Sequence, residues 1–236
     1  MPIVAAVINR YSTGLIITPY SVECVSLSKK KLARHELVAH DLTFLKTKHP
    51  VIRTLRDSFG DASLHGTKVW DSSFVLMDYL LLDPIPEGRV VFDIGCGWGP
   101  ASLFLMKRFK SKVMSIDADD SVEPYLQLHG QLNNLKPVFW QRKIKQLAID
   151  DLSMADTVIG ADICFWDSLA KEWKSLIKRA KKAGVRQVLI ADPGRQPFHD
   201  LADWAVKKYQ AELWQHDINI PLKASSYVLD IHLNPQ

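Results

Sequence analysis

VVFDIGCGWGPASLFLMKRFK, residues Val90–Lys110, is the stretch that decides the fold of this chain. An apolar run opens it, an acid-and-glycine turn follows at Asp93–Gly99, and a helical pattern comes directly after. Pro100 stands at the first helical position, where its missing N–H costs nothing. Strand, turn and helix form the first half of a nucleotide-binding α/β unit. The glycines let the backbone approach a ligand, and the helix start offers it free N–H groups.

The spacing of the glycines separates two kinds of nucleotide-binding protein. Dinucleotide-binding turns have the pattern G-x-G-x-x-G. Here Gly95, Gly97 and Gly99 alternate after Asp93. This pattern departs from the dinucleotide spacing and resembles the first motif of class I S-adenosylmethionine methyltransferases. A lone glycine turn is a weak signal, so the remainder of the chain has to support it.

Length, composition and charge indicate an ordinary globular protein. The 236 residues suit one α/β domain with an N-terminal addition, and the 47% hydrophobic and 24% charged content is typical. The net charge of +4 is mild, and the basic run 29–31 has no interleaved aromatic residues, so no nucleic-acid partner is expected. No apolar run approaches the ~20 residues of a membrane span, and the N-terminus lacks a signal peptide's basic region. We expect a soluble, cytoplasmic protein without a membrane partner.

Cysteine and histidine spacing predicts neither a disulfide framework nor a metal site. Cys24, Cys96 and Cys164 lie far apart without a C-x-x-C pattern, and the eight histidines are dispersed. We expect the cysteines to be small buried side chains that pack in the core, and the protein to work in a reducing compartment.

Apolar segments and helical patterns alternate along the second part of the chain. After the opening unit, strands are predicted at 112–116, 137–140, 156–160 and 185–191, and helices at 121–134, 169–183 and 197–209. A further helix is predicted within 66–82, with Asp71 or Ser72 as its cap. Two closing strands, 211–220 and 227–233, have no helix between them and predict an antiparallel pair. The fold class is therefore α/β: a Rossmann-like, seven-stranded, mostly parallel sheet with an antiparallel C-terminal strand pair and helices on both faces.

Residues 1–65 are predicted to form an N-terminal accessory segment, and residues 66–236 the main domain. Short strands at 3–8 and 15–18 surround a turn-prone stretch, which predicts a hairpin. Residues 50–59 have helical spacing.

Four polar loops are predicted to meet at one edge of the sheet. Asp93–Gly99, Asp117, Asp162 and Asp192–Arg195 all follow the carboxyl ends of strands, where open α/β sheets bind their ligands. Asp117 lies 22 residues after Gly95, about the spacing of the carboxylate that binds the ribose of a nucleotide. A carboxylate suits that task because its two oxygens accept from two vicinal hydroxyls.

Several of these motifs together resemble the seven-β-strand protein lysine methyltransferases of the family-16 type. They are Trp70-Asp71, DIGCGWG at 93–99, Asp117 and ADICF at 161–165. That family carries an acid-x-x-aromatic motif, usually D-x-x-Y, after its fourth strand, and here phenylalanine replaces the tyrosine and its hydroxyl. The turn 192–195 is similar to one in the branch that modifies lysines of the electron-transfer-flavoprotein β subunit. The resemblance covers about residues 66–236.

The resemblance implies S-adenosylmethionine as the cofactor and a protein lysine as the acceptor. The donor-site residues that it implies are Trp70, Asp93, Gly95, Gly97, Asp117 and Asp162. Gly95 and Gly97 would line the methionine and ribose part of the donor, with Asp93 near its amino group. Asp117 would hold the ribose hydroxyls, and Trp70 would pack at the pocket mouth. Asp162 and Phe165 are the implied catalytic residues, with Asp162 beside the transferring methyl and orienting the amine.

Some residues and functions keep two interpretations at this point. Trp70 suits the core as well as the site, and Trp140 and Trp166 suit the core at least as well as an adenine stack. Arg195 is expected to bridge Asp192 or cap a helix. A small-molecule N-methyltransferase would share the donor site, and a non-catalytic Rossmann-like binding module is a further alternative. An NAD(P)-dependent oxidoreductase is opposed by the glycine spacing and the terminal strand pair.

Overall fold

The computed structural model describes residues 35–59 and 66–233. The strands predicted at 3–8 and 15–18, the basic run 29–31 and Cys24 lie outside the described residues.

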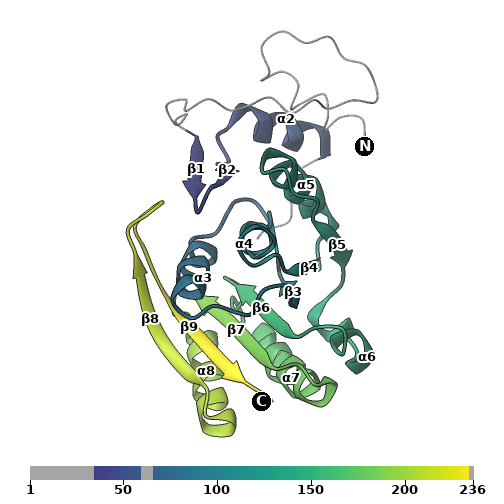
Figure 1. Ribbon diagram of the computed structural model, residues 1–236, viewed down its shortest axis with the longest axis vertical. Coiled ribbons are helices and arrows are strands. Elements are labelled where there is room, and N and C mark those ends of the chain that lie inside the picture. Colours follow the sequence, from purple (N-terminus) through teal and green to yellow (C-terminus); the bar gives the residue numbers. More distant parts are fainter. Residues whose placement is uncertain (1–34, 60–65, 234–236) are drawn as a thin grey trace.

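A seven-stranded sheet forms the centre of the molecule (Figure 1). Its strands, in spatial order, are β5 (Val138–Gln141), β4 (Lys112–Asp117), β3 (Val90–Ile94), β6 (Thr157–Ala161), β7 (Gln187–Asp192), β9 (Ala224–His232) and β8 (Glu212–Ile218). The first five strands run parallel, whereas β9 is antiparallel to both β7 and β8. This order confirms the predicted sheet, including its antiparallel C-terminal pair.

Helices cover both faces of the sheet (Figure 1). One face carries α3 (Asp71–Leu82), α4 (Pro100–Phe109) and α5 (Glu123–Leu132), and the other carries α6 (Ile149–Leu152), α7 (Asp167–Ala183) and α8 (Gln196–Tyr209). Two short 3₁₀ turns, η1 (Asp120–Val122) and η2 (Ile144–Gln146), lie in the loops after β4 and β5. The predicted helices are confirmed, with α5 beginning after the η1 turn.

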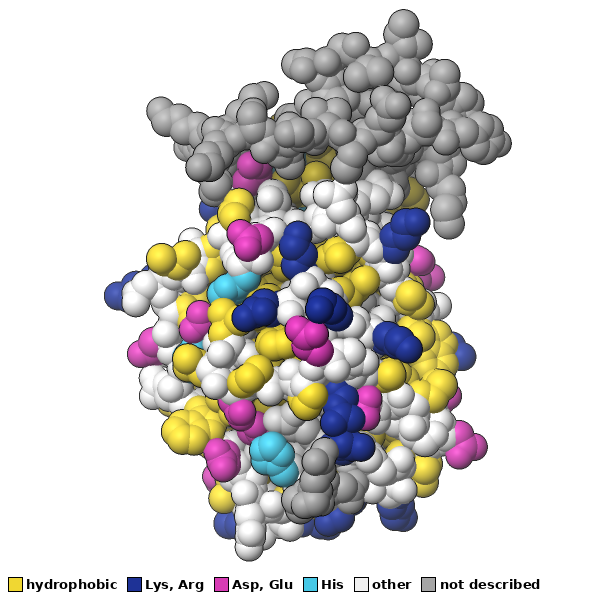
Figure 2. Space-filling view, viewed as in Figure 1, with side chains coloured by type: hydrophobic (Ala, Val, Ile, Leu, Met, Phe, Trp, Pro, Cys, Tyr) yellow, Lys and Arg dark blue, Asp and Glu magenta, His cyan; other side chains and the backbone are white. Residues whose placement is uncertain are grey.

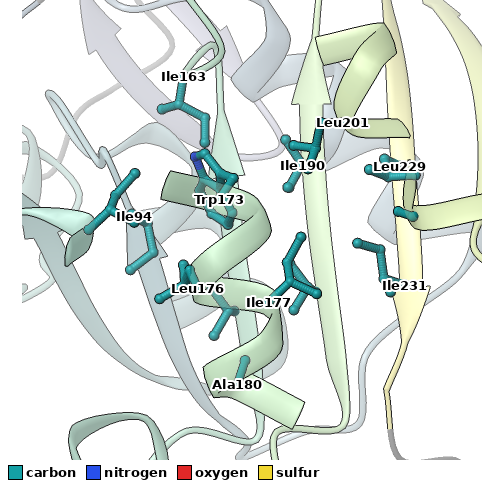
Figure 3. Close-up of a cluster of buried hydrophobic side chains, with 14 of the residues drawn as sticks. Ile94, Ile163, Trp173, Leu176, Ile177, Ala180, Ile190, Leu201, Leu229 and Ile231 are labelled. Carbon is teal, nitrogen blue, oxygen red and sulfur yellow. The ribbon is translucent and has the colours of Figure 1, made fainter. Parts of the chain in front are cut away.

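The amphipathic pattern of α7 determines which side of it meets the sheet. Trp173, Leu176 and Ile177 are fully buried and point at strand residues such as Ile190 and Ile231 (Figure 3). Burying apolar side chains of this size stabilises the fold by about 1.5–3 kcal/mol each. Gly184 ends the helix in a left-handed conformation that glycine adopts without steric cost.

A hairpin and a helix pack beside α4 and α5: β1 (Glu36–Ala39), β2 (Leu42–Leu45) and α2 (Pro50–Phe59). The helix predicted at 50–59 is thus confirmed. Leu45, Ile52 and Leu55 form one buried cluster with Trp98 and Tyr125. The described part of the predicted accessory segment therefore shares a core with α5, while the boundary at residue 66 stays a prediction.

The predicted cap of α3 is wrong. The residue at the N-cap is Trp70, and its side chain makes no capping hydrogen bond. The Ser72 N–H instead donates to the carboxylate of Asp162, 90 residues away in sequence, at 3.2 Å. A side chain from a distant loop has taken the place of a local cap, which sequence spacing does not reveal.

The described surface seen in Figure 2 mixes basic, acidic and apolar side chains instead of presenting a single sign of charge. Within residues 35–59 and 66–233, no helix is both long and apolar enough to cross a membrane.

Candidate active site

The glycine turn between β3 and α4 forms the floor of the site. Gly95, Gly97 and Gly99 all have positive φ (72°, 52° and 80°), a conformation that side chains disfavour. The amides of Gly95 and Cys96 donate to the Ile116 carbonyl, which ties the turn to β4. A Cβ on Gly95 would lie 2.5 Å from Ile163 Cγ2, whereas a Cβ on Gly97 would meet no atom within 4 Å. Gly97 therefore faces open space.

A cavity of about 320 Å³ lies against this turn. Six of the residues predicted for the site line it: Trp70, Gly95, Gly97, Asp117, Asp162 and Phe165. Apolar side chains supply another part of the wall: Ile94, Ile144, Ile163 and Leu169. Charged side chains of Asp119, Arg142, Lys143 and Glu172 also line this cavity. The structure thus brings together the six predicted residues from the loops after β3, β4 and β6, which the sheet topology places at one edge, and from the loop before α3.

Asp117 presents a carboxylate to the cavity from the end of β4. Its Oδ2 accepts from the Gly97 N–H at 3.0 Å, and its Oδ1 accepts from the Asp119 N–H at 3.1 Å. Burial raises the pKa of Asp117, and these backbone hydrogen bonds oppose that shift. A carboxylate has about four acceptor positions, so both oxygens can take a further donor from a ligand.

Asp93 lies below the turn and is not among the residues that line the cavity. It is 2% exposed and accepts a hydrogen bond from Ser102 Oγ at 2.6 Å. Ser115 Oγ in turn donates to Ser102 Oγ at 2.8 Å. Asp93 thus anchors the start of α4 to the sheet, and its contact with the amino group of a donor stays a prediction.

Asp162 lies directly after β6 and lines both the first cavity and a second one. Its backbone has a φ of 57°, and its side chain is almost completely buried. Its Oδ1 accepts from Arg195 Nη2 at 2.8 Å, and its Oδ2 accepts from the Ser72 N–H. The acid is therefore fixed in orientation between the start of α3 and the turn after β7.

The second cavity, of about 220 Å³, adjoins the same acid on its other side. Its lining is mostly polar or charged: Lys68, Trp70, Asp71, Ser72, Asp162, Pro193, Arg195, Ala224, Ser225 and Ser226. Trp70 and Asp162 line both cavities and so mark the boundary between them.

Aromatic rings stand at this boundary. The ring of Trp70 meets that of Phe165 edge to face, with centroids 5.5 Å apart. Arg195 lies over the other ring of the pair, its Cζ 4.2 Å from the Phe165 centroid, and Lys68 Nζ lies 4.2 Å from the Trp70 centroid. Trp70 therefore lines both cavities and is not part of the buried hydrophobic clusters, and its contact with a donor stays a prediction.

The two tryptophans considered for an adenine stack lie elsewhere. Trp140 packs against the core and meets Phe92 edge to face, and Trp166 is exposed. Neither lines the first cavity. Cys96 and Cys164 are buried free cysteines, and burial raises the pKa of both thiols. No group of three or more potential ligands for a metal ion is found within the described ranges.

Arg195 makes more contacts than its place in the sequence predicts. Its predicted bridge to Asp192 is present, with Nη1 to Oδ2 at 2.8 Å, but the same guanidinium also binds Asp162 and covers Phe165. One signal pointed to this contact: Arg195 and Asp162 both follow strand ends at the same edge of the sheet.

The strand order, the closing antiparallel pair and the cavity at the glycine turn define the class I methyltransferase fold. Solved structures agree with this assignment. The chain is similar to the SAM-dependent methyltransferase from Agrobacterium tumefaciens (TM-score 0.60, 12% identity), covering 87% of this chain and 72% of that one. It is also similar to the human methyltransferase 10 domain containing protein (TM-score 0.54, 14% identity), covering 77% and 94% of the two chains.

Among curated proteins, the chain matches electron transfer flavoprotein beta subunit lysine methyltransferases. It is 27% identical to the Xenopus laevis protein over 161 residues and 28% identical to the Danio rerio protein over 132 residues. These matches cover 68% and 56% of this chain, and 63% and 50% of the two relatives. The chain thus spans between half and two thirds of the length of these relatives. No family model matches it. The resemblance expected from the motifs is confirmed.

Proposed function

We propose that this protein is an S-adenosylmethionine-dependent methyltransferase that modifies a lysine side chain of a protein. One observation carries the proposal: two cavities meet at Asp162 and Trp70, one lined by the glycine turn, Asp117 and apolar side chains, the other mostly by polar or charged residues. A transfer between two molecules needs this arrangement, because donor and acceptor must meet across a shared wall.

The first cavity fits the methyl donor. Asp117 has acceptor positions left for two ribose hydroxyls, and the open side of Gly97 leaves room beside them. Ile94, Ile144 and Leu169 offer apolar surface for an adenine. Asp162 and Glu172 give the cavity negative charge, which suits a sulfonium. The residues present therefore fit this cofactor.

The methyl transfer mainly requires that the donor methyl group and the acceptor amine be aligned. When bound, S-adenosylmethionine supplies a methyl group already activated on a positive sulfur. Asp162 can orient the acceptor amine from a fixed position, beside the paired rings of Trp70 and Phe165. The amine has to lose its proton before it forms the new N–C bond and the S–C bond breaks. Phe165 has no hydroxyl that could accept that proton. In this proposal a water molecule accepts it.

The protein acceptor is supported by the relatives, which are named as lysine methyltransferases of the electron transfer flavoprotein beta subunit. A small-molecule N-methyltransferase would use the same donor cavity. A cytoplasmic location and the absence of a nucleic-acid partner belong to this proposal as well.

Two substitutions separate the proposed roles of the acids. Asp117→Ala should weaken binding of S-adenosylhomocysteine by about tenfold or more, because two hydroxyls lose a charged acceptor. Asp162→Ala should mainly lower turnover. Calorimetry without added metal measures the first effect, and transfer of a labelled methyl group measures the second. Equal loss of donor binding in both variants would contradict this division, and failure of the unaltered protein to bind would overturn the donor assignment.

The acceptor class can be tested directly. A cell lysate incubated with the protein and tritiated S-adenosylmethionine should yield a discrete labelled protein band. Label found only in small molecules would instead support the small-molecule alternative.

A further inference from the structure

Arg195 joins the two acids that follow β6 and β7. Its two terminal nitrogens bind Asp162 and Asp192 at 2.8 Å each, and its Cζ lies 4.2 Å from the centre of the Phe165 ring. Asp192 is fully buried, and its Oδ1 also accepts from the backbone amides of Gly194 and Arg195. The turn 192–195 is thus folded around the Asp192 carboxylate, and the Arg195 guanidinium also reaches the Asp162 carboxylate.

This arrangement sets the charge that an acceptor meets. One guanidinium between two carboxylates leaves this cluster with a net charge of about −1; Asp192 is buried and lines neither cavity, whereas Asp162 and Arg195 line the second cavity. Lys68 and Asp71 also face this cavity, and Asp117, Asp119, Arg142, Lys143 and Glu172 face the donor cavity beyond Asp162. Although burial works to lower the pKa of Arg195, its hydrogen bonds to Asp162 and Asp192 and their charges raise it overall. The guanidinium therefore stays charged at any pH at which the protein is folded.

The charge matters because a lysine amine attacks only when it is neutral. An unopposed carboxylate pair would favour the ammonium form. We infer that Arg195 is a positioning residue of the methyl transfer. It fixes Asp162 and the Phe165 ring between the two cavities, and it offsets the acid pair so that the acceptor can lose its proton. This inference rests on the proposed function and names a residue that acts through Asp162.

The test compares three variants of the full chain. Arg195→Met removes the charge at similar length. Arg195→Lys keeps a charge, but a single ammonium does not bind two carboxylates in the forked geometry of a guanidinium. Arg89→Met is the matched control, since Arg89 binds Asp156 at 3.1 Å with 24% of its side chain exposed, against 25% for Arg195. Arg89 lies at the start of β3, at the opposite end of the strand from the glycine turn.

Arg195→Met should lower kcat by about tenfold or more at pH 8, while KM for the lysine substrate stays the same or falls. The reason is that two uncompensated acids hold the ammonium more tightly and raise the amine pKa by about one unit or more. The pH of half-maximal turnover should therefore move upward in Arg195→Met and much less in Arg195→Lys. Arg89→Met should match the unaltered protein, and the affinity for S-adenosylhomocysteine should change less than about threefold in all variants.

A second readout needs neither donor nor turnover. The Ser72 N–H donates to Asp162, so release of Asp162 should speed hydrogen exchange of that amide in Arg195→Met and not in Arg89→Met. Unchanged exchange, kcat and pH profile in Arg195→Met would overturn the inference. If that variant does not fold, Arg195→Lys decides: reduced kcat at normal donor affinity supports the inference, and unaltered kcat overturns it. An unaltered protein without donor binding or turnover would refute the proposed function instead.

Discussion

At the scale of single residues, Asp93 shows how the site is built at a cost to stability. Burial raises its pKa from 3.8 to about 6, the Ser102 hydrogen bond opposes that shift, and the charge of Asp117 adds to it. The folded protein therefore holds this proton more tightly than the unfolded chain does. The contribution of Asp93 to stability consequently falls as the pH rises from about 4 to 6, and the cost is fully present above pH 6.

Asp93→Asn should remove this cost, since an amide does not ionise and its oxygen can still accept from Ser102. Relative to the unaltered protein, the variant should gain about 2 kcal/mol of unfolding free energy between pH 4.5 and pH 8. Urea unfolding at the two pH values measures the gain. A difference between the two proteins that does not vary with pH would show that Asp93 ionises normally.

The residues of the site were predictable where the chemistry is local. Glycines at alternate positions and an acid at the end of the next strand are signals within one stretch of chain. The contacts of Asp162 with Arg195 and with the Ser72 amide join residues 33 and 90 positions apart. Such contacts depend on tertiary structure, and no spacing in the sequence encodes the distance between two loops.

At the scale of elements, His129 fastens the N-terminal hairpin to α5. Its Nε2 accepts from the Leu45 N–H at 3.0 Å, so its Nδ1 carries the proton that is donated to the Tyr125 carbonyl at 2.8 Å. Burial lowers the pKa of His129 from 6.5 to about 4, and the hydrogen bond to the Tyr125 carbonyl opposes that shift. Asn133, one turn further along, binds both the N–H and the carbonyl of Thr43.

This junction should weaken in acid. The folded pKa of His129 is lower than the unfolded one, so its stabilising effect is complete above pH 6.5 and is lost as the pH falls from there toward 4. Moving from pH 7.5 to pH 5 should cost the unaltered protein about 2 kcal/mol more than His129→Gln, which does not titrate. Urea unfolding at both pH values tests this, and equal losses in the two proteins would contradict it. The sign is opposite to that of Asp93, so the two substitutions separate the effects.

Elements were predictable where an apolar or alternating pattern marks them, including β5, which is only partly buried, and β8, which is mostly exposed. Parallel strands covered on both faces form apolar runs bounded by turns, and β3, β4, β6 and β7 have this form. The hairpin at 36–45 was not predicted, because apolar and charged residues are mixed in the stretch 32–45. Its place in the fold depends on the side chains of α5, about 85 residues later.

At the scale of the whole molecule, residues 35–59 pack against the main domain: Ala39, Leu42 and Phe44 share a buried cluster with α3 and α4, and a second cluster includes α2. Ile52 on α2 is completely buried and belongs to the cluster that includes Trp98 of the glycine turn and Tyr125 of α5. The Trp98 and Tyr125 rings of that cluster stack on each other, with their centroids 4.7 Å apart. The indole N–H of Trp98 also donates to the Gly66 carbonyl at 2.7 Å.

Ile52→Ala should therefore lower the free energy of unfolding of the whole protein by about 3 kcal/mol, through lost burial and the cavity left behind. Leu82→Ala is the control, because Leu82 is 73% exposed and should change stability by less than about 0.5 kcal/mol. Denaturant unfolding followed by tryptophan fluorescence and by far-ultraviolet circular dichroism measures both. Separate transitions for the two probes would show that the N-terminal part folds independently.

The backbone of Asp162 has a consequence for the inheritance of this function. Its φ of 57° is one that glycine adopts without steric cost. One nucleotide change converts an aspartate codon into a glycine codon, and that change would relax the turn while deleting its carboxylate. The glycine turn and Asp117 lie on other loops and would keep their places. Under the proposed function, a descendant one mutation away would keep the donor cavity but lose the acid assigned to methyl transfer, so selection for that activity would hold this side chain against the preference of its own backbone.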